Sequence, residues 1–217
     1  MSKVIKLTFG PFQENTYIVY DETLECVILD PGCCTERERW QLAHEITQLG
    51  LKPVRLLNTH CHIDHIPGNP FVANTYGLGL EIHRQEVEIL ANAPLFADMF
   101  QIEVPEQPPV SAFINEGDEI HFGNTVFKVL FTPGHSPGSI CFYNEKEHYV
   151  ISGDVLFRLS IGRYDLPGAD GKTLYESITK KMMTLPDDVT VYSGHGPETT
   201  IGYERGHNPF LKRGAFV

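Results

Sequence analysis

Four side chains of the kinds that bind metal ions lie within one short segment, Thr59-His-Cys-His-Ile-Asp-His65. His60 and His62 are separated by one residue, so in an extended segment their imidazoles project to the same side and can bind one ion. Asp64 and His65 follow as the chain turns toward a Pro-Gly pair, and this change of direction can aim them at a second ion. Because solvated loops and helix caps rarely gather imidazoles in this way, the segment predicts a metal centre.

Three later residues occur in similar surroundings. His135 lies in Thr-Pro-Gly-His-Ser-Pro-Gly, Asp154 in Ser-Gly-Asp, and His195 in Ser-Gly-His-Gly, and each follows a predicted strand. A neighbouring glycine or proline lets the backbone turn sharply and approach an ion closely. A single histidine in a turn is more often an exposed polar residue, but beside the first cluster we expect these three to complete the site.

Seven donors favour two metal ions over one. Four or five ligands would close a single structural site, whereas seven can serve two ions and leave room for solvent. Asp154 has two oxygens and is the natural bridge, and a shared water or hydroxide, its pKa lowered by both cations, would be the nucleophile. We expect Asp64 to help orient it. Two divalent ions are predicted, zinc first, with iron and manganese as alternatives that the same donors accept.

Composition sets the class of protein. Apolar residues make up 41% and charged residues 21% of the 217 residues, which is typical of globular proteins. Chains of this length commonly form one domain, so we expect a single domain over 1–217. Seventeen Lys and Arg stand against 28 Asp and Glu, a formal charge of -11 that two dications would only partly offset. Nucleic acid is therefore not an expected partner.

The N-terminus, MSKVIKLTFG, has neither a sustained apolar core nor a small-residue cleavage site, and no later stretch is long enough to span a bilayer. We expect a cytoplasmic protein without membrane contact. Five cysteines, an odd number without a CxxC pair, indicate reduced thiols. The adjacent Cys33 and Cys34 could be redox-active, but small apolar filler beside a turn is the favoured interpretation.

Hydrophobic periodicity predicts two similar halves, each with strands first and a helix afterwards. The first helix should be capped by Thr35 and Glu38 and stopped by Gly50. Gly123 and Asn124 should form a hairpin turn. Strands are predicted at 4–9, 16–20, 26–29, 54–57, 119–122, 125–131, 139–143, 149–152 and 189–192, and helices at 35–49, 67–76, 85–100, 173–184 and 201–205.

A proline-rich insertion at 101–110 interrupts this pattern, and Pro94 should kink or split the helix before it. The insertion is either a lid over the site or an inert surface connection, since long loops serve both purposes.

The HxHxDH pattern of His60, His62, Asp64 and His65 resembles the hallmark of the metallo-β-lactamase superfamily. The resemblance covers nearly the whole chain. It implies an α+β fold, a four-layer αβ/βα sandwich of two mixed β-sheets flanked by helices. It also implies the metal assignments: one ion held by His60, His62 and His135, the other by Asp64, His65 and His195, with Asp154 bridging them. Lactamases proper often place Cys at the bridging position, so the aspartate favours another branch.

Within that superfamily the chain is most similar to the short glyoxalase II-like hydrolases, through Gln13-Glu-Asn-Thr-Tyr17, Gly153-Asp-Val-Leu-Phe-Arg158 and Ser160-Ile-Gly-Arg-Tyr-Asp-Leu-Pro-Gly168. The likeness implies hydrolysis of a small-molecule thioester such as S-D-lactoylglutathione by a metal-bridging hydroxide. A thiolate can leave without being protonated by a strong general acid, because the pKa of a thiol lies near 8.5. Longer glyoxalase II enzymes carry a C-terminal helical domain with basic residues for glutathione, whereas only 22 residues follow His195.

Three residues just past the bridging aspartate, Arg158, Arg163 and Tyr164, could hold an anionic substrate or could simply form salt bridges and pack the loop. Other functions remain as alternatives: a mononuclear-iron persulfide dioxygenase, a lactone or phosphodiester hydrolase of the same fold, and a metal-binding interaction module without turnover. No oligomeric state is predicted. The other five histidines should be structural or on the surface: His44, His83, His121, His148 and His207.

Overall fold

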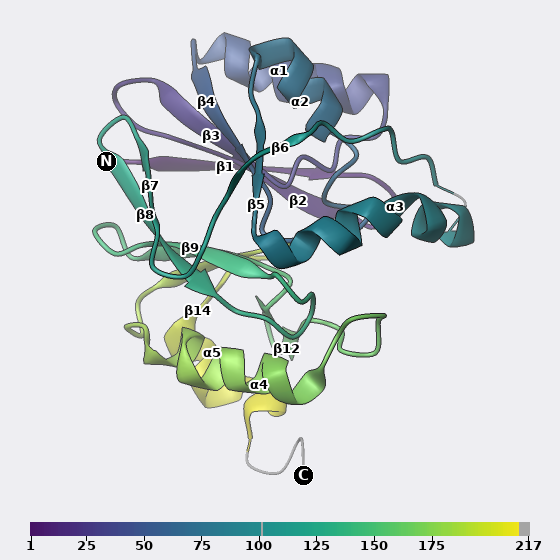
Figure 1. Ribbon diagram of the computed structural model, residues 1–217. Coiled ribbons are helices and arrows are strands. Elements are labelled where there is room, and N and C mark those ends of the chain that lie inside the picture. The colour runs from purple at the N-terminus through teal and green to yellow at the C-terminus, as the bar shows by residue number, and fades with distance from the viewer. Residues whose placement is uncertain (101, 213–217) are drawn as a thin grey trace.

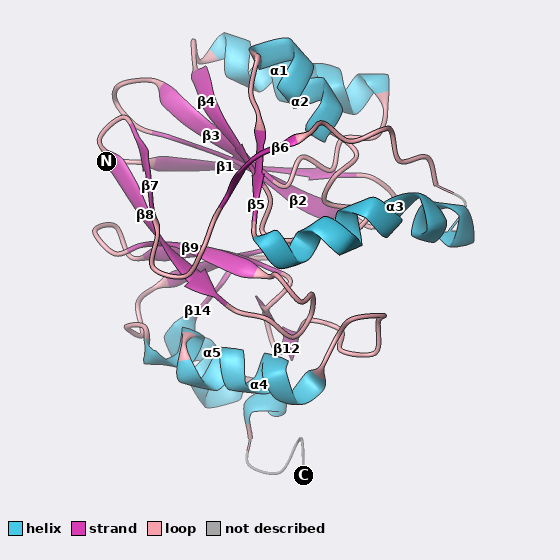
Figure 2. Cartoon of the chain, viewed as in Figure 1, coloured by secondary structure: helices cyan, strands magenta, loops and turns pink. Residues whose placement is uncertain are grey.

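Two six-stranded β-sheets lie face to face, with helices on the outer face of each (Figure 1). The structure, a computed structural model, describes residues 1–100 and 102–212. Helices α1 and α2 lie above the upper sheet in this view, and α4 and α5 lie below the lower sheet (Figure 2). The fold is therefore the four-layer αβ/βα sandwich that the sequence predicted.

The first sheet is mixed and has the strand order β1-β2-β3-β4-β5-β6. Its first three strands are antiparallel, and β3 to β6 run parallel to one another. The strands are β1 (Lys3–Phe9), β2 (Glu14–Tyr20), β3 (Glu25–Leu29), β4 (Lys52–Leu57), β5 (Leu80–Ile82) and β6 (Val110–Phe113).

The second sheet has the order β14-β13-β10-β9-β8-β7, and of the strand pairs in the described part of the chain its β10–β13 pair alone is parallel. A two-stranded β11–β12 ribbon follows β10 along the chain. The strands are β7 (Glu119–Phe122), β8 (Thr125–Phe131), β9 (Ile140–Asn144), β10 (Tyr149–Gly153), β11 (Leu156–Phe157), β12 (Ser160–Ile161), β13 (Thr190–Ser193) and β14 (Thr199–Thr200).

Among the described residues, three α-helices accompany the first sheet and two the second. The α-helices are α1 (Glu36–Gln48), α2 (Asn69–Tyr76), α3 (Val87–Phe100), α4 (Gly171–Lys180) and α5 (Ile201–His207), and short 3-10 turns lie at Arg84–Glu86, Met182–Thr184 and Pro209–Leu211. None of the helices in the described residues combines the length and apolar character that crossing a membrane requires.

Side chains that alternate along the strands form the core. On β2, Tyr17 and Val19 point between the sheets, where they meet Phe127 and Phe142 of the second sheet, whereas Ile18 between them points toward the helices. Because both faces of the central strands are covered, these strands are buried almost without interruption. The backbone at their ends is thereby held in place, and this is where the candidate site lies.

Every predicted strand and helix has a counterpart, and the differences are local. The expected capping box is present: Glu38 N donates to Thr35 Oγ1, and the Glu38 carboxylate accepts from Thr35 N. The two-residue hairpin turn is also present, since Phe122 pairs with Thr125. The helix expected from 67 begins at Asn69 instead, because the preceding residues form a turn in which Gly68 N donates to Pro31 O.

Two other helix boundaries were wrong. The helix expected over 85–100 does not break at Pro94: it is continuous from Val87 to Phe100, and a 3-10 turn precedes it. The helix expected over 173–184 begins at Gly171, where the Asp170 side chain accepts from Thr173 N, and it ends at Lys180. Asp170 thus acts as an N-cap that the apolar pattern alone does not reveal.

Candidate metal centre

The candidate ligands lie on four loops, each at the carboxyl end of a strand. The segment from His60 to His65 follows β4, whereas His135 follows β8, Asp154 follows β10 and His195 follows β13. Strands β8, β10 and β13 run in the same direction, because β9 is antiparallel to both β8 and β10, and β10 is parallel to β13. Their carboxyl ends therefore meet at one edge of the second sheet, as in other sites built on aligned strands.

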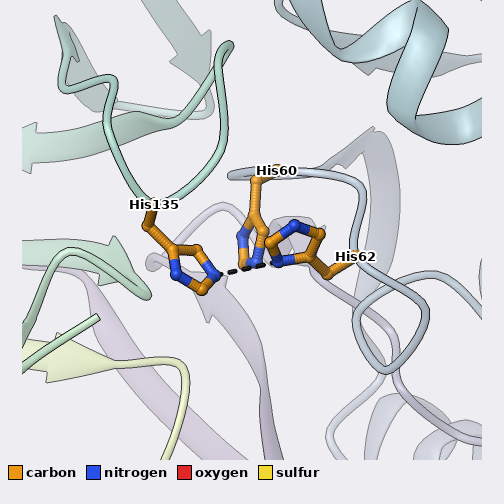
Figure 3. Close-up of side chains that lie close together, drawn as sticks. All are labelled: His60, His62 and His135. Atoms are coloured by element: carbon orange, nitrogen blue, oxygen red, sulfur yellow. Dashed lines mark hydrogen bonds between the residues drawn. The ribbon is translucent and has the colours of Figure 1, made fainter. Parts of the chain in front are cut away.

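His60, His62 and His135 form one compact group (Figure 3). Their imidazoles face one another, with ring centroids 4.6 to 4.9 Å apart, and one nitrogen from each lies within 4.8 Å of the others. His62 Nδ1 and His135 Nε2 are 2.9 Å apart. Three imidazole nitrogens at these separations match the donor set that zinc or iron takes.

Asp64, His65 and His195 form a second group whose donor atoms also lie within 4.8 Å of one another. Asp154 lies between the two groups. Its Oδ2 is 3.5 Å from both His135 Nε2 and His195 Nε2, and its Oδ1 is 3.5 Å from His65 Nε2. The structure thus brings all seven predicted residues together and places the carboxylate of Asp154 where it can reach both groups.

Buried atoms without partners show that this arrangement fits metal ions. Six buried side-chain atoms of the described residues have no hydrogen-bond partner, and three of them belong to candidate ligands: His60 Nε2, His65 Nε2 and Asp154 Oδ1. Polar atoms left unpaired inside a protein are costly, and a bound cation would satisfy these three. Imidazole and carboxylate donors suit divalent cations.

Hydrogen bonds made by Nδ1 of His135 and His195 orient these rings so that Nε2 points toward the other candidate ligands. His135 Nδ1 donates to Arg163 O at 2.8 Å, and His195 Nδ1 donates to Phe12 O at 3.1 Å. A backbone carbonyl can only accept, so each of these rings keeps a proton on Nδ1, and Nε2 is the nitrogen that can bind an ion. These bonds hold each ring in the orientation that ligation requires.

The electrostatics differ between the two groups. Burial keeps the imidazoles of the first group neutral, whereas the nearby carboxylates raise the pKa values of His65 and His195 in the second. Burial and the neighbouring imidazoles lower the pKa of His60 well below its ordinary value and that of His62 to about 3. Although burial alone would raise the pKa of Asp154, the charge of His65 and hydrogen bonds from His195 hold it well below its usual range. The deprotonated forms of all three are the forms that bind metals.

The same carboxylates make the centre attractive to positive charge. Burial by itself lowers the pKa of His195, but its hydrogen bonds to Asp154 and Asp64 raise that pKa to about 10. His195 Nε2 lies 3.2 Å from Asp64 Oδ2. Negative charge gathered among buried imidazoles is the environment that a dication stabilises most strongly.

Asp30, which the sequence did not indicate as a site residue, forms hydrogen bonds that hold the segment carrying His60 and His65. Its carboxylate accepts from Thr59 N at 2.7 Å, from Thr59 Oγ1 at 2.5 Å and from His65 Nδ1 at 3.2 Å. Because the hydroxyl proton of Thr59 is used in this way, His60 Nδ1 donates to Thr59 Oγ1 at 3.0 Å. One carboxylate at the end of β3 thus sets the orientation of two candidate ligands.

Glu86 was missed as well and joins the two loops that carry His62 and His135. Its buried carboxylate accepts from Cys61 N at 2.7 Å, from Ser136 Oγ at 2.5 Å and from Gly138 N at 2.6 Å. Burial raises its pKa, and these three bonds oppose the rise. The residues that Glu86 joins are far apart in sequence, so only the structure reveals its role.

The Gln13-Glu-Asn-Thr-Tyr17 segment holds the loop of His195. Asn15 Nδ2 donates to Ser193 O at 3.0 Å and to Gly196 O at 2.9 Å, and Tyr17 OH donates to Ser193 O at 2.6 Å. A Cβ atom on Gly194, between them, would overlap Asp154 Oδ1, so glycine is required there. The first sheet therefore fixes a ligand loop of the second.

A cavity of about 530 Å³ opens directly over both groups. Of the three residues considered for substrate binding, Arg163 lines this cavity, and its guanidinium donates to both carboxylate oxygens of Asp165 at 2.9 and 3.0 Å. Arg158 and Tyr164 are not among the described lining residues. Arg158 lies over the ring of Tyr203, 5.3 Å from its centroid, which is the packing alternative considered above.

The proline-rich segment packs partly against the core. Within its described part, 102–110, Ile102 and Val104 contact the core between the first sheet and its helices, and Gln107 accepts from Asn69 Nδ2 at 3.0 Å. Residue 101 lies outside the described residues. The last residue, Val110, begins strand β6, which the sequence did not predict.

The remaining histidines and cysteines have other surroundings. His44 stacks on Trp40, and His148 lies 2.6 Å from Asp188 on the surface. All five cysteines are free, and burial raises the pKa of the Cys33 thiol to about 12, which suits a packing role better than a reactive one.

Comparison with known proteins agrees with this geometry. The sequence model of the metallo-beta-lactamase superfamily matches residues 9–195, so the chain belongs to that superfamily. Two curated relatives within the superfamily are named as hydrolases. The probable metallo-hydrolase YqgX of Bacillus subtilis is 40% identical, over 95% of this chain and 96% of its own length. The hydroxyacylglutathione hydrolase GloC of Haemophilus influenzae is 34% identical, over 92% and 93%.

Solved structures give the same fold. A crystal structure of the BLEG-1 B3 metallo-beta-lactamase has a TM-score of 0.89 and 38% identity, covering 98% of this chain and all of that one. The structure of TTHA1623 in a di-iron-bound form has a TM-score of 0.86 and 41% identity, covering 96% and 100%. The chain is thus a metal-dependent hydrolase of this superfamily, and its His and Asp groups imply divalent metal ions.

Proposed function

We propose that the protein hydrolyses thioesters, in the manner of glyoxalase II, with two divalent metal ions held by the seven clustered residues. The observation that carries the proposal is the position of Asp154, whose two oxygens face both imidazole groups at the floor of an open cavity. The likeness to the hydroxyacylglutathione hydrolase GloC along nearly the whole chain supports the thioester as substrate class.

Two bound cations would supply Lewis acidity toward a carbonyl oxygen and would lower the pKa of a water between them. The side chains of this protein would hold the two ions and orient the water. His60, His62 and His135 form one binding set, and Asp64, His65 and His195 form the other, with Asp154 shared. Asp64 lines the cavity with a side chain that is 18% exposed, and in this proposal it accepts a hydrogen bond from the attacking water and orients it.

Hydrolysis of a thioester in this cavity would not need a strong general acid to protonate the leaving group. Apart from the candidate ligands and Arg163, its described lining is largely apolar, and a thiolate can depart unprotonated because its pKa is near 8.5. An alkoxide or amine leaving group would instead need a proton donor beside the metal groups. The lining therefore favours thioesters over ordinary esters and amides.

The test is a substrate panel assayed with protein purified without chelators and with its metals counted. We expect S-D-lactoylglutathione or another acyl thioester to be hydrolysed at least about a hundredfold more efficiently, in kcat/KM, than lactones, phosphodiesters or β-lactams. Metal content should approach two ions per chain, with zinc as the first candidate and iron as the second.

Three results would contradict the proposal. A β-lactam that outcompetes every thioester would make the protein a lactamase, as the likeness to BLEG-1 allows. Oxygen uptake with glutathione persulfide and one iron per chain would make it a dioxygenase. A metal-loaded protein inert toward every substrate in the panel would be a binding module.

A further inference from the structure

One wall of the cavity is apolar and partly exposed to water. Helix α3 contributes Ile89, Phe96, Met99 and Phe100 to it, a spacing that places these side chains along one side of the helix. Met99 is 75% exposed and Phe100 is 48% exposed. Large apolar side chains left in water around a cavity indicate a surface that a ligand covers.

A second element completes this wall. Phe12, in the turn between β1 and β2, packs edge to face against Phe100, with ring centroids 5.9 Å apart. The backbone carbonyl of Phe12 accepts from His195 Nδ1, so the same residue connects the apolar wall to the metal groups. A chain lying on this wall would therefore have its reacting end directly over the ligands.

Charge around the cavity does not favour an anionic carrier. Within the described lining, Arg163 is the one side chain of Lys or Arg, and its Nε and Nη2 already donate to the carboxylate of Asp165. Glutathione carries two carboxylates and coenzyme A carries phosphates, and binding such groups normally takes Arg or Lys side chains that are free to form new ion pairs. The polar carrier of a thioester would therefore extend from the cavity into solvent.

We propose that the protein selects thioesters by an apolar acyl chain, which lies along α3 and Phe12, and not by the thiol carrier. This inference rests on the proposed thioester hydrolysis and names its substrate class. The hydrolysis step is unchanged: water adds to the carbonyl carbon, the C–S bond breaks, and a carboxylic acid and a thiol are formed. A lactoyl group, which is small and polar, would leave most of this wall in water.

The first test varies acyl length on one carrier. Acyl thioesters of N-acetylcysteamine from acetyl to octanoyl are assayed with the metal-loaded enzyme, below the concentration at which they form micelles. Each methylene moved from water onto an apolar wall can raise kcat/KM up to about fourfold. With partial burial, we expect octanoyl to exceed acetyl by about a hundredfold. An octanoyl-to-acetyl ratio below about threefold would overturn the inference, since no burial of the chain would then be visible.

A matched pair of variants locates the effect. Met99→Gln places a polar amide in the apolar wall, and Leu95→Gln makes a comparable change at a residue of the same helix that is 65% exposed and not among the described lining residues. We expect the octanoyl-to-acetyl ratio to fall about fivefold in Met99→Gln and to change less than about twofold in Leu95→Gln. Equal effects in the two variants would place the acyl chain elsewhere.

A binding measurement separates this inference from the proposed function. S-octyl and S-methyl thioethers of N-acetylcysteamine cannot be hydrolysed, and calorimetry with the metal-loaded protein compares their affinities. Tighter binding of the octyl compound, with a negative heat-capacity change that Met99→Gln reduces, supports the apolar wall even if no thioester is turned over. Equal affinities overturn the acyl-chain inference even if lactoylglutathione is a good substrate.

Discussion

At the scale of single residues, Asp154 joins the two halves of the centre. Its oxygens lie 3.5 Å from nitrogens of His65, His135 and His195, which come from three different loops. The Asp154→Ala variant should lose at least one metal ion per chain and at least about a hundredfold in kcat/KM. Metal analysis by mass spectrometry and a thioester assay measure both. Asp165→Ala, which removes an exposed carboxylate at the rim, is the control and should keep its metals.

A full complement of metal and activity in Asp154→Ala would remove the bridging assignment.

Asp30 offers a test of positioning without direct ligation. Asp30→Asn should weaken metal binding by about 10- to 100-fold, because the amide cannot accept from Thr59 and His65 together as the carboxylate does. Competition with a chromogenic chelator gives the affinity. Asp21→Asn is the matched control: Asp21 is also buried and accepts from Thr23 N at 2.9 Å and from Thr125 Oγ1 at 2.8 Å, but it lies outside the site.

Equal loss of metal affinity in both aspartate variants would mean that Asp30 acts through general stability alone.

The sequence reveals the ligands more readily than the residues that support them. His60 to His65 are recognisable because four donors crowd one segment, and Asp154 because a Ser-Gly turn precedes it at a strand end. Asp30 and Glu86 have no such local pattern. Each acts across more than twenty residues of sequence, on Thr59 and Ser136 respectively, so their roles exist only after the loops have been brought together.

At the scale of elements, Glu38 links α1 to the turn that precedes it. Its carboxylate accepts from Gly10 N at 2.9 Å, Cys34 N at 3.0 Å and Thr35 N at 3.0 Å. Although burial opposes ionisation, these hydrogen bonds lower its pKa from the ordinary 4.5 to about 2. A carboxyl whose pKa is lowered by folding stabilises the protein fully above pH 4.5, and that stabilisation is lost as pH falls toward 2.

Glu38→Gln should therefore lower the free energy of unfolding by about 1–2 kcal/mol at pH 7, a value reduced for solvent screening, and by less at pH 3. Urea unfolding of wild type and variant at several pH values measures the difference. Glu36→Gln, an exposed change in the same first turn, should cost less than about 0.5 kcal/mol at either pH. A Glu38→Gln deficit that does not vary with pH would show that the charge is not what stabilises the cap.

The strands that the sequence did not indicate are short or exposed. Strand β5 has three residues, and β11, β12 and β14 have two each, too few for alternation to be recognised. Strand β6 has four residues, but three of them are exposed, so it has no buried face to give an alternating pattern. Leu80 and Ile82 on β5 are buried because neighbouring strands pair with them on both sides. Such strands are formed by tertiary pairing, whereas α1 and β8 are long enough to be read from their own residues.

At the scale of the whole molecule, metal binding and folding should be coupled. His60 Nε2, His65 Nε2 and Asp154 Oδ1 are buried without hydrogen-bond partners among the described residues, so cations that satisfy them will bind the folded chain far better than the unfolded one. A metal at a hundred times its dissociation constant stabilises a protein by about 2.7 kcal/mol. A chelator should therefore lower the melting temperature by several degrees, and added zinc should restore it.

Calorimetric scans of Asp154→Ala provide the control for that effect, since the variant should respond less to both chelator and zinc. A wild-type melting temperature indifferent to chelator, in protein shown to have lost its metals, would contradict the coupling.

The division of the candidate ligands between the two sheets has a consequence for how activity is acquired during synthesis. The N-terminal half supplies His60, His62, Asp64 and His65, and the C-terminal half supplies His135, Asp154 and His195. A nascent chain that has completed only its first sheet holds an incomplete set, and a damaged chain whose second sheet has opened loses the rest. Turnover would thus begin only when the two sheets have packed together. The number of metal ions bound per chain would then measure the fraction of correctly folded molecules in a preparation.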